Sequence, residues 1–349
     1  MHHLAPLLLQ APRNILVRMP NWLGDFVMAT PILTDLRAYW PETKISVMCQ
    51  NPLNAVIQHD PHINEVINFQ RPKGFFDRRA RKEILFSLKK GHYDLGILLT
   101  NSFSSAYLFW QGAVQNRIGY ATHMRSLLLN YPISFPEKRD SQHLVLTYKM
   151  LLAPLGIPLS DTAPILYVKE QEQLAARGKL EALGVKPTDR LLGINPGAAY
   201  GSAKCWLPER FKELNALLLN NSSLKIIYFG DKAGAPLVRD ICANFPQERV
   251  IDLAGKTSLR ELLAYIQACD LFLTNDSGPM HVASALGVPL IALFGSTSDV
   301  ATGPYAGGHV IHKHVECSPC YKRLCPIDFR CMKRIEVSEV YDVVMRKCK

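Results

Sequence analysis

The sequence predicts an α/β protein with two doubly wound parallel-sheet domains. Short apolar segments alternate with longer helical segments in both halves, a pattern typical of strands that helices cover on both faces. The chain of 349 residues is also longer than a single hydrophobic core usually serves. A polar helical stretch, KEQEQLAARGKLEALG, ends at Gly184 and marks the approach to a second domain. We expect an N-terminal domain over residues 1–175, a second domain over 185–335, and a C-terminal helix over 336–349 that could pack back on either domain, the N-terminal one included.

The individual elements follow from hydrophobic periodicity, flanking turn residues and segment length. Ligands of such sheets bind beyond the carboxyl ends of the strands, so functional residues are expected in the loops that follow strands. The expected strands are Asn14–Met19, Lys44–Cys49, Asp94–Thr100, Leu191–Asn195, Leu224–Phe229, Val250–Leu253, Asp270–Thr274 and Pro289–Phe294. The expected helices are Gly24–Tyr39, Pro208–Asn220, Ala235–Asn244, Leu259–Ala268, Met280–Leu286 and Val337–Lys347.

Composition and charge narrow the class of protein. A hydrophobic content of 48% with 20% charged residues is that of a globular protein and excludes a disordered chain or a fibre. The net charge of +10 favours an anionic partner such as nucleic acid, nucleotide, phospholipid or phosphorylated glycolipid. Much of the excess lies in residues 71–90, where apolar residues alternate with basic ones. That segment is either a surface for an anionic membrane or glycolipid, or a solvated helix face.

The apolar stretch near the start of the sequence is short. The apolar stretch Leu4–Leu9 has no Lys or Arg before it and is a poor secretory signal, so we expect a cytoplasmic protein. The nine cysteines are then expected as reduced thiols. Four of them have the spacing C-x2-C-x4-C-x5-C, which could hold zinc or an iron–sulfur cluster, but it is not the paired spacing of a zinc ribbon. We therefore expect no bound metal at Cys317, Cys320, Cys325 and Cys331.

The loop after the first strand, PNWLGD, offers a carboxylate. Gly24 permits a tight turn or a close backbone approach, and Asp25 falls in the first turn of the next helix. The helix dipole there favours an ionised carboxylate, which can accept a proton from a substrate hydroxyl. The alternative is that Asp25 only caps its helix.

Two loops in the second half resemble phosphate cradles. After Leu191–Asn195, the segment NPGAAYGSAK combines small residues with a cation, and we single out Gly197, Ser202 and Lys204. After Asp270–Thr274, the segment TNDSGPMH opens a helix whose backbone N–H groups suit an anion. In that segment the candidates are Thr274, Asp276, Ser277, Gly278 and His281, and Gly230 follows a neighbouring strand. The alternatives are a solvated surface loop, a helix cap at Asp276 or Ser277, and a structural histidine.

These three loops together resemble the lipopolysaccharide-core heptosyltransferases, glycosyltransferase family 9. The matching segments are ILVRMPNWLGDFVMATPIL, NPGAAYGSAKCWLPERF and TNDSGPMHVASALGVPLIALFGS. A fourth segment, NSFSSAYLFWQGAVQNRIGYATHMRSLLLN, is similar to the heptosyltransferase II branch. The resemblance extends over residues 14–345 and implies a GT-B fold, in which two Rossmann-like domains face a central cleft.

The resemblance also implies a reaction and its residues. It implies inverting transfer of heptose from ADP-L-glycero-D-manno-heptose to the heptose–Kdo–lipid A inner core, with no cofactor or essential metal. Asp25 would be the general base and Lys204 would balance charge on the leaving ADP, while the 274–281 loop holds the nucleotide sugar. Acceptor contacts would come from the first domain, and the enzyme would touch the inner face of the anionic inner membrane. The acceptor candidates are Gly24, Asn101, Arg71, Lys73, Arg78 and Arg79.

Three other functions compete with this one. The first is a family 9 transferase with a different nucleotide sugar or acceptor. The second is a basic nucleic-acid-binding protein with a cysteine metal module, against which no recognised nucleic-acid motif is present. The third is a nucleotide-dependent dehydrogenase, against which the G-x-G-x-x-G fingerprint is missing.

Overall fold

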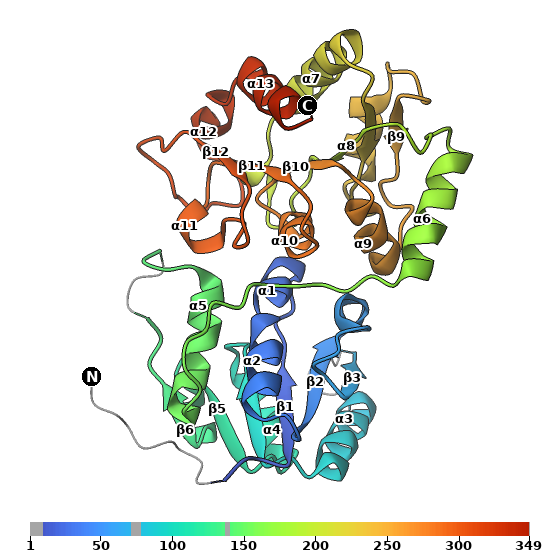
Figure 1. Cartoon of the computed structure of the whole chain (residues 1–349). Helices are drawn as coiled ribbons and strands as arrows, with labels where there is room; N and C mark the ends of the chain where they lie inside the picture. Colours follow the sequence, from blue (N-terminus) through green and yellow to red (C-terminus); the bar gives the residue numbers. More distant parts are fainter. Residues whose placement is uncertain (1–9, 71–77, 137–139, 349) are drawn as a thin grey trace. The chain divides into compact units, whose positions relative to one another are not determined.

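The computed structural model describes residues 10–70, 78–136 and 140–348 (Figure 1). The chain divides into two compact units, residues 1–165 and 166–349. The division comes before helix α6 (Glu170–Ala182), which the expected boundary at 175 would have cut. Helix α6 belongs to the second unit because it packs on α9 (Leu259–Gln267), where Arg260 forms an ion pair with Glu172.

The first unit is built on a parallel sheet with the order β3-β2-β1-β4-β5-β6 in the described residues. This is the Rossmann order, in which the direction of winding reverses between the first and fourth strands. Three of these strands, β3, β5 and β6, are absent from the sequence prediction because they are short and carry polar residues or proline. The strands are β1 (Asn14–Arg18), β2 (Lys44–Gln50), β3 (Glu65–Phe69), β4 (Leu95–Leu98), β5 (Asn116–Tyr120) and β6 (Tyr131–Ile133).

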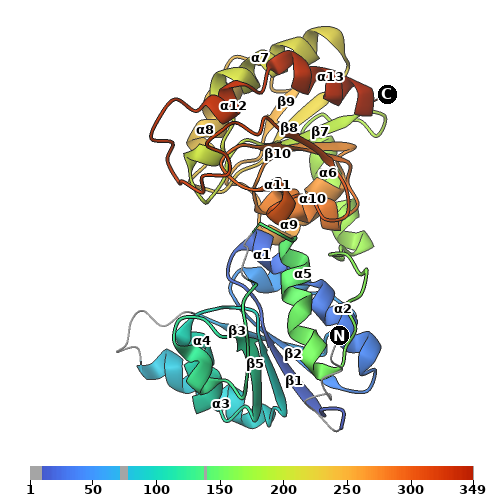
Figure 2. The same cartoon turned by 90° about the vertical axis from the view of Figure 1, so that its left-hand side faces the viewer.

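Helices cover both faces of this sheet (Figure 2). Helices α1 (Leu23–Met28), α2 (Pro31–Tyr39) and α5 (Leu144–Lys149) pack together on one face. On the other face α3 (Arg78–Gly91) packs on α4 (Phe103–Gln111). Short 3-10 turns at Leu53–Ile57, Arg125–Leu128 and Met150–Leu155 complete the described part of the unit.

The single helix expected over Gly24–Tyr39 is wrong, since the structure has two. Pro31 starts α2 at its first position, where its fixed φ is favourable and its missing N–H costs nothing. Inside one continuous helix the same proline would have removed a hydrogen bond and clashed with the preceding turn. The break leaves α1 as a separate short helix that carries Asp25.

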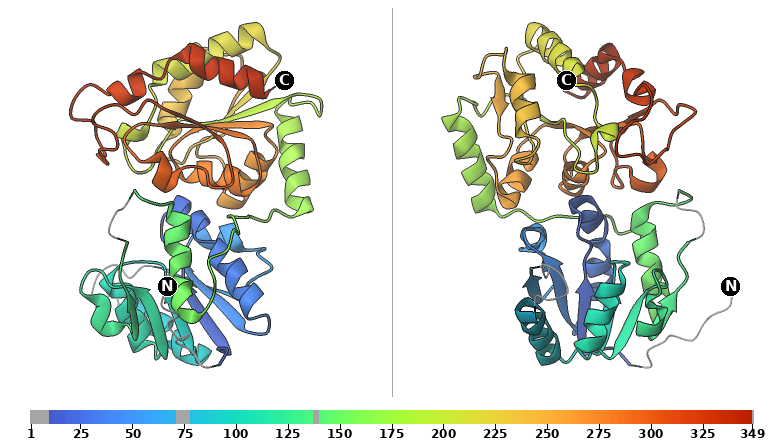
Figure 3. Two further views of the ribbon diagram at one scale, coloured as in Figure 1. Left: turned by 60° about the vertical axis from the view of Figure 1, so that its left-hand side comes forward. Right: turned by 180° about the vertical axis from the view of Figure 1, so that it is seen from behind.

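The second unit repeats the same topology, and its helices again cover both faces (Figure 3). Its sheet has the order β12-β11-β10-β7-β8-β9, so β7 corresponds to β1 and β10 to β4. Strand β12 was not expected. The strands are β7 (Leu191–Asn195), β8 (Lys225–Tyr228), β9 (Val250–Asp252), β10 (Leu271–Asn275), β11 (Leu290–Phe294) and β12 (His309–His312). The remaining helices are α7 (Pro208–Asn221), α8 (Ala235–Cys242), α10 (Gly278–Ala285), α11 (Asp299–Thr302), α12 (Arg330–Lys333) and α13 (Val337–Lys347), with a 3-10 turn at Ser202–Lys204.

The C-terminal helix α13 packs on α7 of the second unit. Its buried face consists of Val337, Val340, Val343 and Val344, which join the hydrophobic core formed by α7 and the sheet. Of the two placements that the sequence allowed, the structure describes packing on the second domain. The apolar face of α13 is buried in its own unit, because its four valines lie within one core.

The two sheets place the candidate loops in equivalent positions. In each sheet the winding reverses between the first and fourth strands, β1 and β4 or β7 and β10, and ligands of such sheets bind at this reversal. Asp25 follows β1, and the cradle that ends at Lys204 follows β7. In the part of the chain that the structure describes, no helix is both long and apolar enough to span a bilayer.

Candidate active site

The two cradle loops of the second unit are joined by one buried amide, that of Asn275. Its Oδ1 accepts a hydrogen bond from the backbone N–H of Trp206 (3.0 Å), and its Nδ2 donates to the carbonyl of Pro196 (2.6 Å). Asn275 is fully buried at the end of β10. Because both partners flank the loop after β7, this side chain sets the position of that loop relative to β10.

A charged cluster lies at the same place. The ammonium of Lys204 donates to Oδ2 of Asp276 at 2.5 Å, and the hydroxyl of Thr297 donates to the same oxygen at 2.6 Å. Asp276 and Thr297 are buried, and the Lys204 side chain is 14% exposed. A buried carboxylate needs such partners, since leaving it unpaired costs several kcal/mol. Lys204 has three N–H donors, and Asp276 accepts one of them.

The start of α10 is arranged differently from either predicted cap. Ser277 occupies the cap position but makes no side-chain cap hydrogen bond. Its hydroxyl instead pairs with Thr274 Oγ1 (3.0 Å) and accepts from Asn195 Nδ2 (3.2 Å), which also donates to the Gly197 carbonyl (2.8 Å). These hydrogen bonds bring Thr274, Ser277 and Gly197 together around Asn195.

For the other residues predicted to bind the donor, the structure describes fewer contacts. Gly278 opens α10, and His281 is buried within its first turns. Ser202 is exposed at the start of the turn that carries Lys204. Gly230 lies after β8, where its carbonyl accepts from Gly255, and no contact ties it to the Lys204 cluster among the interactions described for it.

In the first unit, Asp25 is paired with a tyrosine that the sequence analysis missed. Tyr148, buried on α5, makes a side-chain hydrogen bond with Asp25. Burial, followed by the nearby negative charge of Asp25, raises the pKa of Tyr148 well above its usual value, so its hydroxyl stays protonated and donates. The helix cap of α1 is Trp22, so Asp25 is not a capping residue.

This chain is similar to known proteins over most of its length. The model of glycosyltransferase family 9 (heptosyltransferase) matches residues 81–329. Lipooligosaccharide heptosyltransferase 2 of Haemophilus influenzae is 31% identical over 87% of this chain and 89% of its own length. Lipopolysaccharide heptosyltransferase 2 of Escherichia coli is also 31% identical, over 83% of this chain and 85% of its own.

The chain belongs to glycosyltransferase family 9. Solved structures agree with this assignment across both units. The structure of E. coli ADP-heptose LPS heptosyltransferase II aligns with a TM-score of 0.81 and 27% identity over 96% of this chain and 98% of that one. A glycosyl transferase family 9 structure from Veillonella parvula aligns with a TM-score of 0.84 and 25% identity, over 96% and 97%. The predicted fold class, two Rossmann-like units of the GT-B type, is confirmed, and this family 9 protein is a glycosyltransferase rather than a dehydrogenase or a nucleic-acid-binding protein.

Two buried arginines of this family 9 transferase support loops at the carboxyl edge of the first sheet. Arg18, at the end of β1, donates to Asn21 Oδ1 at 2.7 Å within the loop that leads to Gly24 and Asp25. Arg125 donates to Asn101 Oδ1 at 3.3 Å and to the carbonyl of Tyr120 at 2.7 Å. Burial lowers the pKa of each guanidinium to about 10. Since each arginine remains charged at neutral pH, its bonds to the loops are charge-assisted.

The basic segment of the transferase is only partly described. Arg71 and Lys73 lie outside the described residues, and only the backbone of Arg78, at the start of α3, is described. Arg79 is 92% exposed and pairs with Glu83 at 3.2 Å. The exposed residues Lys82, Phe86, Lys89 and Lys90 follow on α3. The described part of this segment is therefore an exposed helix face that combines cations with an aromatic ring.

The cysteine-rich segment supports the loop that ends at Lys204. The carbonyl of Arg323 accepts from Ala203 N–H at 3.0 Å, and a Cβ on Gly201 would lie 2.3 Å from that oxygen. Tyr200 donates its hydroxyl to the carbonyl of Tyr321, and its ring lies under Lys204 Nζ at 5.0 Å. All four cysteines of the segment are free thiols, and a raised pKa at Cys331 results mainly from burial.

We predict that Asn275→Ala destabilises the second unit. The substitution leaves the Trp206 N–H and the Pro196 carbonyl without their partner in a dry interior, which costs about 1–3 kcal/mol for each group. Chemical denaturation followed by tryptophan fluorescence measures the loss. The matched control is Asn221→Ala, because Asn221 is exposed on α7 and its amide bonds only the Leu217 carbonyl. Equal stability of the two variants would contradict the linking role of Asn275.

Proposed function

We propose that this transferase moves heptose from ADP-L-glycero-D-manno-heptose to the heptose–Kdo–lipid A inner core of lipopolysaccharide, as the second heptose, with inversion at the anomeric carbon. One observation carries the proposal: Lys204 and Asp276 are paired at the strand reversal of the second sheet, and a carboxylate occupies the equivalent place in the first. The relatives named heptosyltransferase 2 support the choice of sugar and acceptor.

The second unit supplies the donor site in this proposal. One N–H of Lys204 is held by Asp276, which directs the ammonium, and its remaining donors are available to the diphosphate. The small residues Gly197 and Gly278 let phosphate oxygens approach the backbone, and the start of α10 adds its positive dipole end. As the bond to the sugar breaks, negative charge grows on the departing ADP, and Lys204 stabilises that charge.

The first unit supplies the base. The Asp25 carboxylate takes the proton from an acceptor hydroxyl while that oxygen attacks the anomeric carbon in line with the leaving ADP. Tyr148 donates to the carboxylate, which stabilises its ionised form and orients it. Gly24 leaves space beside it, and Asn101 is fixed by Arg125 in the neighbouring loop.

The exposed basic face of α3 suits the phosphorylated acceptor and the anionic membrane that carries it. Lys82, Phe86 and Lys90 follow one another at intervals of four residues, and Lys89 comes three residues after Phe86, so the four lie toward one side of the helix. Phe86 is 70% exposed among these lysines. A helix with cations around an exposed ring is typical of peripheral membrane contact, which we assign to the cytoplasmic leaflet of the inner membrane.

A direct assay tests the proposal. The full chain is incubated with a panel of ADP- and UDP-sugars and a truncated inner-core acceptor, and the products are read by mass spectrometry. We expect one heptose to be added, from the ADP-heptose alone. Transfer from a different nucleotide sugar, or no transfer to an acceptor that carries one heptose, would refute the proposed donor or acceptor.

We predict that Asp25→Asn lowers kcat by about 10²–10⁴-fold, the usual contribution of a general base. Binding of ADP is expected to stay unchanged, because the residues assigned to the donor lie on the second unit. Single-turnover transfer and calorimetric titration with ADP separate the two effects. Glu42→Gln, at an exposed position of the same unit, is the matched control. Wild-type turnover of the Asp25 variant would remove it from the mechanism.

We predict that Tyr148→Phe shifts the pH dependence of kcat rather than abolishing activity. The lost hydrogen bond stabilised the ionised carboxylate of Asp25, so the pKa of Asp25 rises in the variant. The base is then protonated at a higher pH, and the acidic limb of the profile moves upward. The profile of kcat against pH from 4 to 9 gives the result, and an unmoved acidic limb would show that Tyr148 serves packing alone.

We predict that Lys204→Ala lowers kcat/KM for the donor by about ten- to a hundred-fold, the value of a charge-assisted hydrogen bond. The KM for the acceptor is expected to change little. Lys212→Ala is the control, since Lys212 pairs with Asp240 on the outer helices of the same unit. Thermal melting of both variants checks that the Asp276 carboxylate, which loses a partner, has not unfolded the unit. Unaltered donor kinetics would remove Lys204 from the site.

A further inference from the structure

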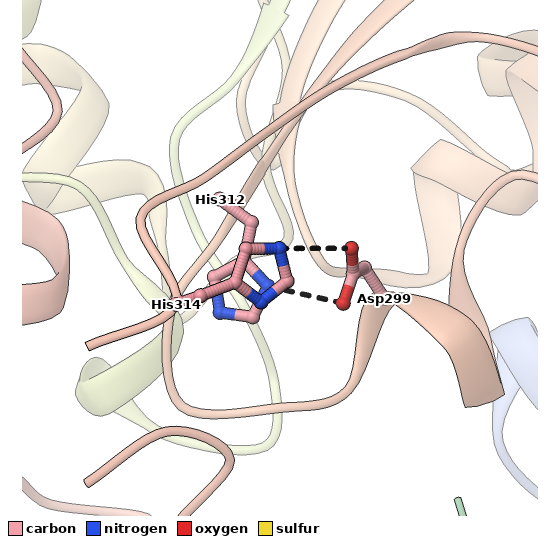
Figure 4. A group of neighbouring side chains, drawn as sticks. All are labelled: Asp299, His312 and His314. Atoms are coloured by element: carbon pink, nitrogen blue, oxygen red, sulfur yellow. Dashed lines mark hydrogen bonds and ion pairs between the residues drawn. The ribbon is translucent and has the colours of Figure 1, made fainter. Parts of the chain in front are cut away.

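A second cluster of chemically active side chains lies at the carboxyl end of β11 and β12. Asp299 begins α11, His312 ends β12, and His314 follows two residues later (Figure 4). One ligand atom from each of the three residues lies within 4.8 Å of the others. Among the described residues this is the one group of three or more His, Cys, Asp or Glu side chains with that geometry.

The hydrogen bonds around His312 determine which ring nitrogen carries its proton. The Ser318 hydroxyl donates its single hydrogen to the Gly295 carbonyl. Nε2 of His312 lies 2.8 Å from the Ser318 oxygen and must therefore be the donor of that bond. In a neutral imidazole Nδ1 is then unprotonated, and it faces Asp299 Oδ1 at 3.0 Å.

A lone pair on nitrogen therefore faces a carboxylate oxygen at contact distance. The two atoms repel each other unless a positive charge lies between or beside them, which is either a second proton on His312 or a cation. His314 favours the cation, because its Nε2 lies 3.7 Å from Asp299 Oδ2 and faces the same carboxylate. The backbone of His314 has a positive φ of 41°, an uncommon conformation, and the ring centroids of His312 and His314 lie 4.0 Å apart.

We propose that Asp299, His312 and His314 bind a divalent transition-metal ion such as zinc or ferrous iron. Ligand atoms that share such an ion at about 2.1 Å are separated by about 3.0–3.4 Å. The two histidine nitrogens lie 3.0 and 3.7 Å from the Asp299 oxygens that they face. Two imidazoles and one carboxylate are a common ligand set for both metals. Ser318 would be the outer partner that keeps His312 in the tautomer that can bind.

The position of the site shows what the ion would do. Asp299 comes two residues after Thr297, whose hydroxyl donates to Asp276 of the donor cluster. His312 also reaches, through Ser318, the segment that supports the Lys204 loop. A metal here would hold the loop after β11 in place beside the donor cluster. The site is independent of the proposed transfer reaction, which takes no step through it.

His314 is the more exposed of the two histidines, so replacing it disturbs the fold less. The His314 side chain is 68% exposed, so His314→Ala removes a ligand without opening the core. His123→Ala is its matched control, because His123 is also exposed and also has a positive φ, of 49°. Cys320→Ser controls for metal held by the nearby thiols.

The experiment measures binding of Zn²⁺ and Co²⁺ to the full chain, produced without a histidine tag, by equilibrium dialysis and by the visible spectrum of the Co²⁺ form. We expect one equivalent per chain, a loss of affinity of at least tenfold in His314→Ala and in Asp299→Asn, and no change in His123→Ala or Cys320→Ser. The Co²⁺ form should lack a thiolate charge-transfer band.

Three results would overturn the proposal. They are no binding by the wild-type chain, equal binding by His314→Ala and the wild type, and a thiolate band that disappears in Cys320→Ser. The last would assign the metal to the cysteines. The heptosyl-transfer assay is separate, so a failure of the metal site leaves the proposed function standing, and the reverse also holds.

Discussion

The loops at the strand reversal of the second sheet depend on one buried ion pair, that of Lys204 and Asp276. A carboxylate that is 4% exposed is stable only where cations and donors surround it, and Lys204 and Thr297 meet at a single oxygen of Asp276. The pair links loops from three strands, β7, β10 and β11, at one edge of the sheet. The amide of Asn275 adds an uncharged link between the loop after β7 and the end of β10.

The first unit has a carboxylate, that of Asp25, at the equivalent edge of its sheet. The Asp25 carboxylate, which we propose as the general base, must be ionised and hold a fixed orientation, and the hydrogen bond from the buried Tyr148 favours both. The break between α1 and α2 at Pro31 is what leaves α1 as a short helix that packs on α5, where Tyr148 lies. The helix break that Pro31 causes therefore affects Asp25 through the packing of α1 on α5.

The segment after β12 has a supporting role that its cysteine spacing does not indicate. It supplies carbonyl oxygens of Tyr321 and Arg323 to the Lys204 loop, and Gly201 is needed there because any Cβ would strike the Arg323 backbone. It also supplies Ser318 to the cluster of Asp299, His312 and His314. A metal at that cluster would stabilise the same edge of the sheet from the outside, which gives the second unit two independent means of holding its donor loops.

The sequence by itself determined the α/β class, strands β1, β2 and β4 of the first sheet and β7 to β11 of the second, and the loops that hold Asp25, Lys204 and Asp276. Apolar periodicity and the position of polar residues after strands are local properties. It did not indicate β3, β5, β6 or β12, whose short or polar segments become strands only by pairing with a neighbour. Only the tertiary structure decided that α13 covers its own unit and that Tyr148, Asn275 and Thr297 complete the site. Those three side chains look ordinary in sequence, since their roles depend on partners that the fold brings in from distant parts of the chain.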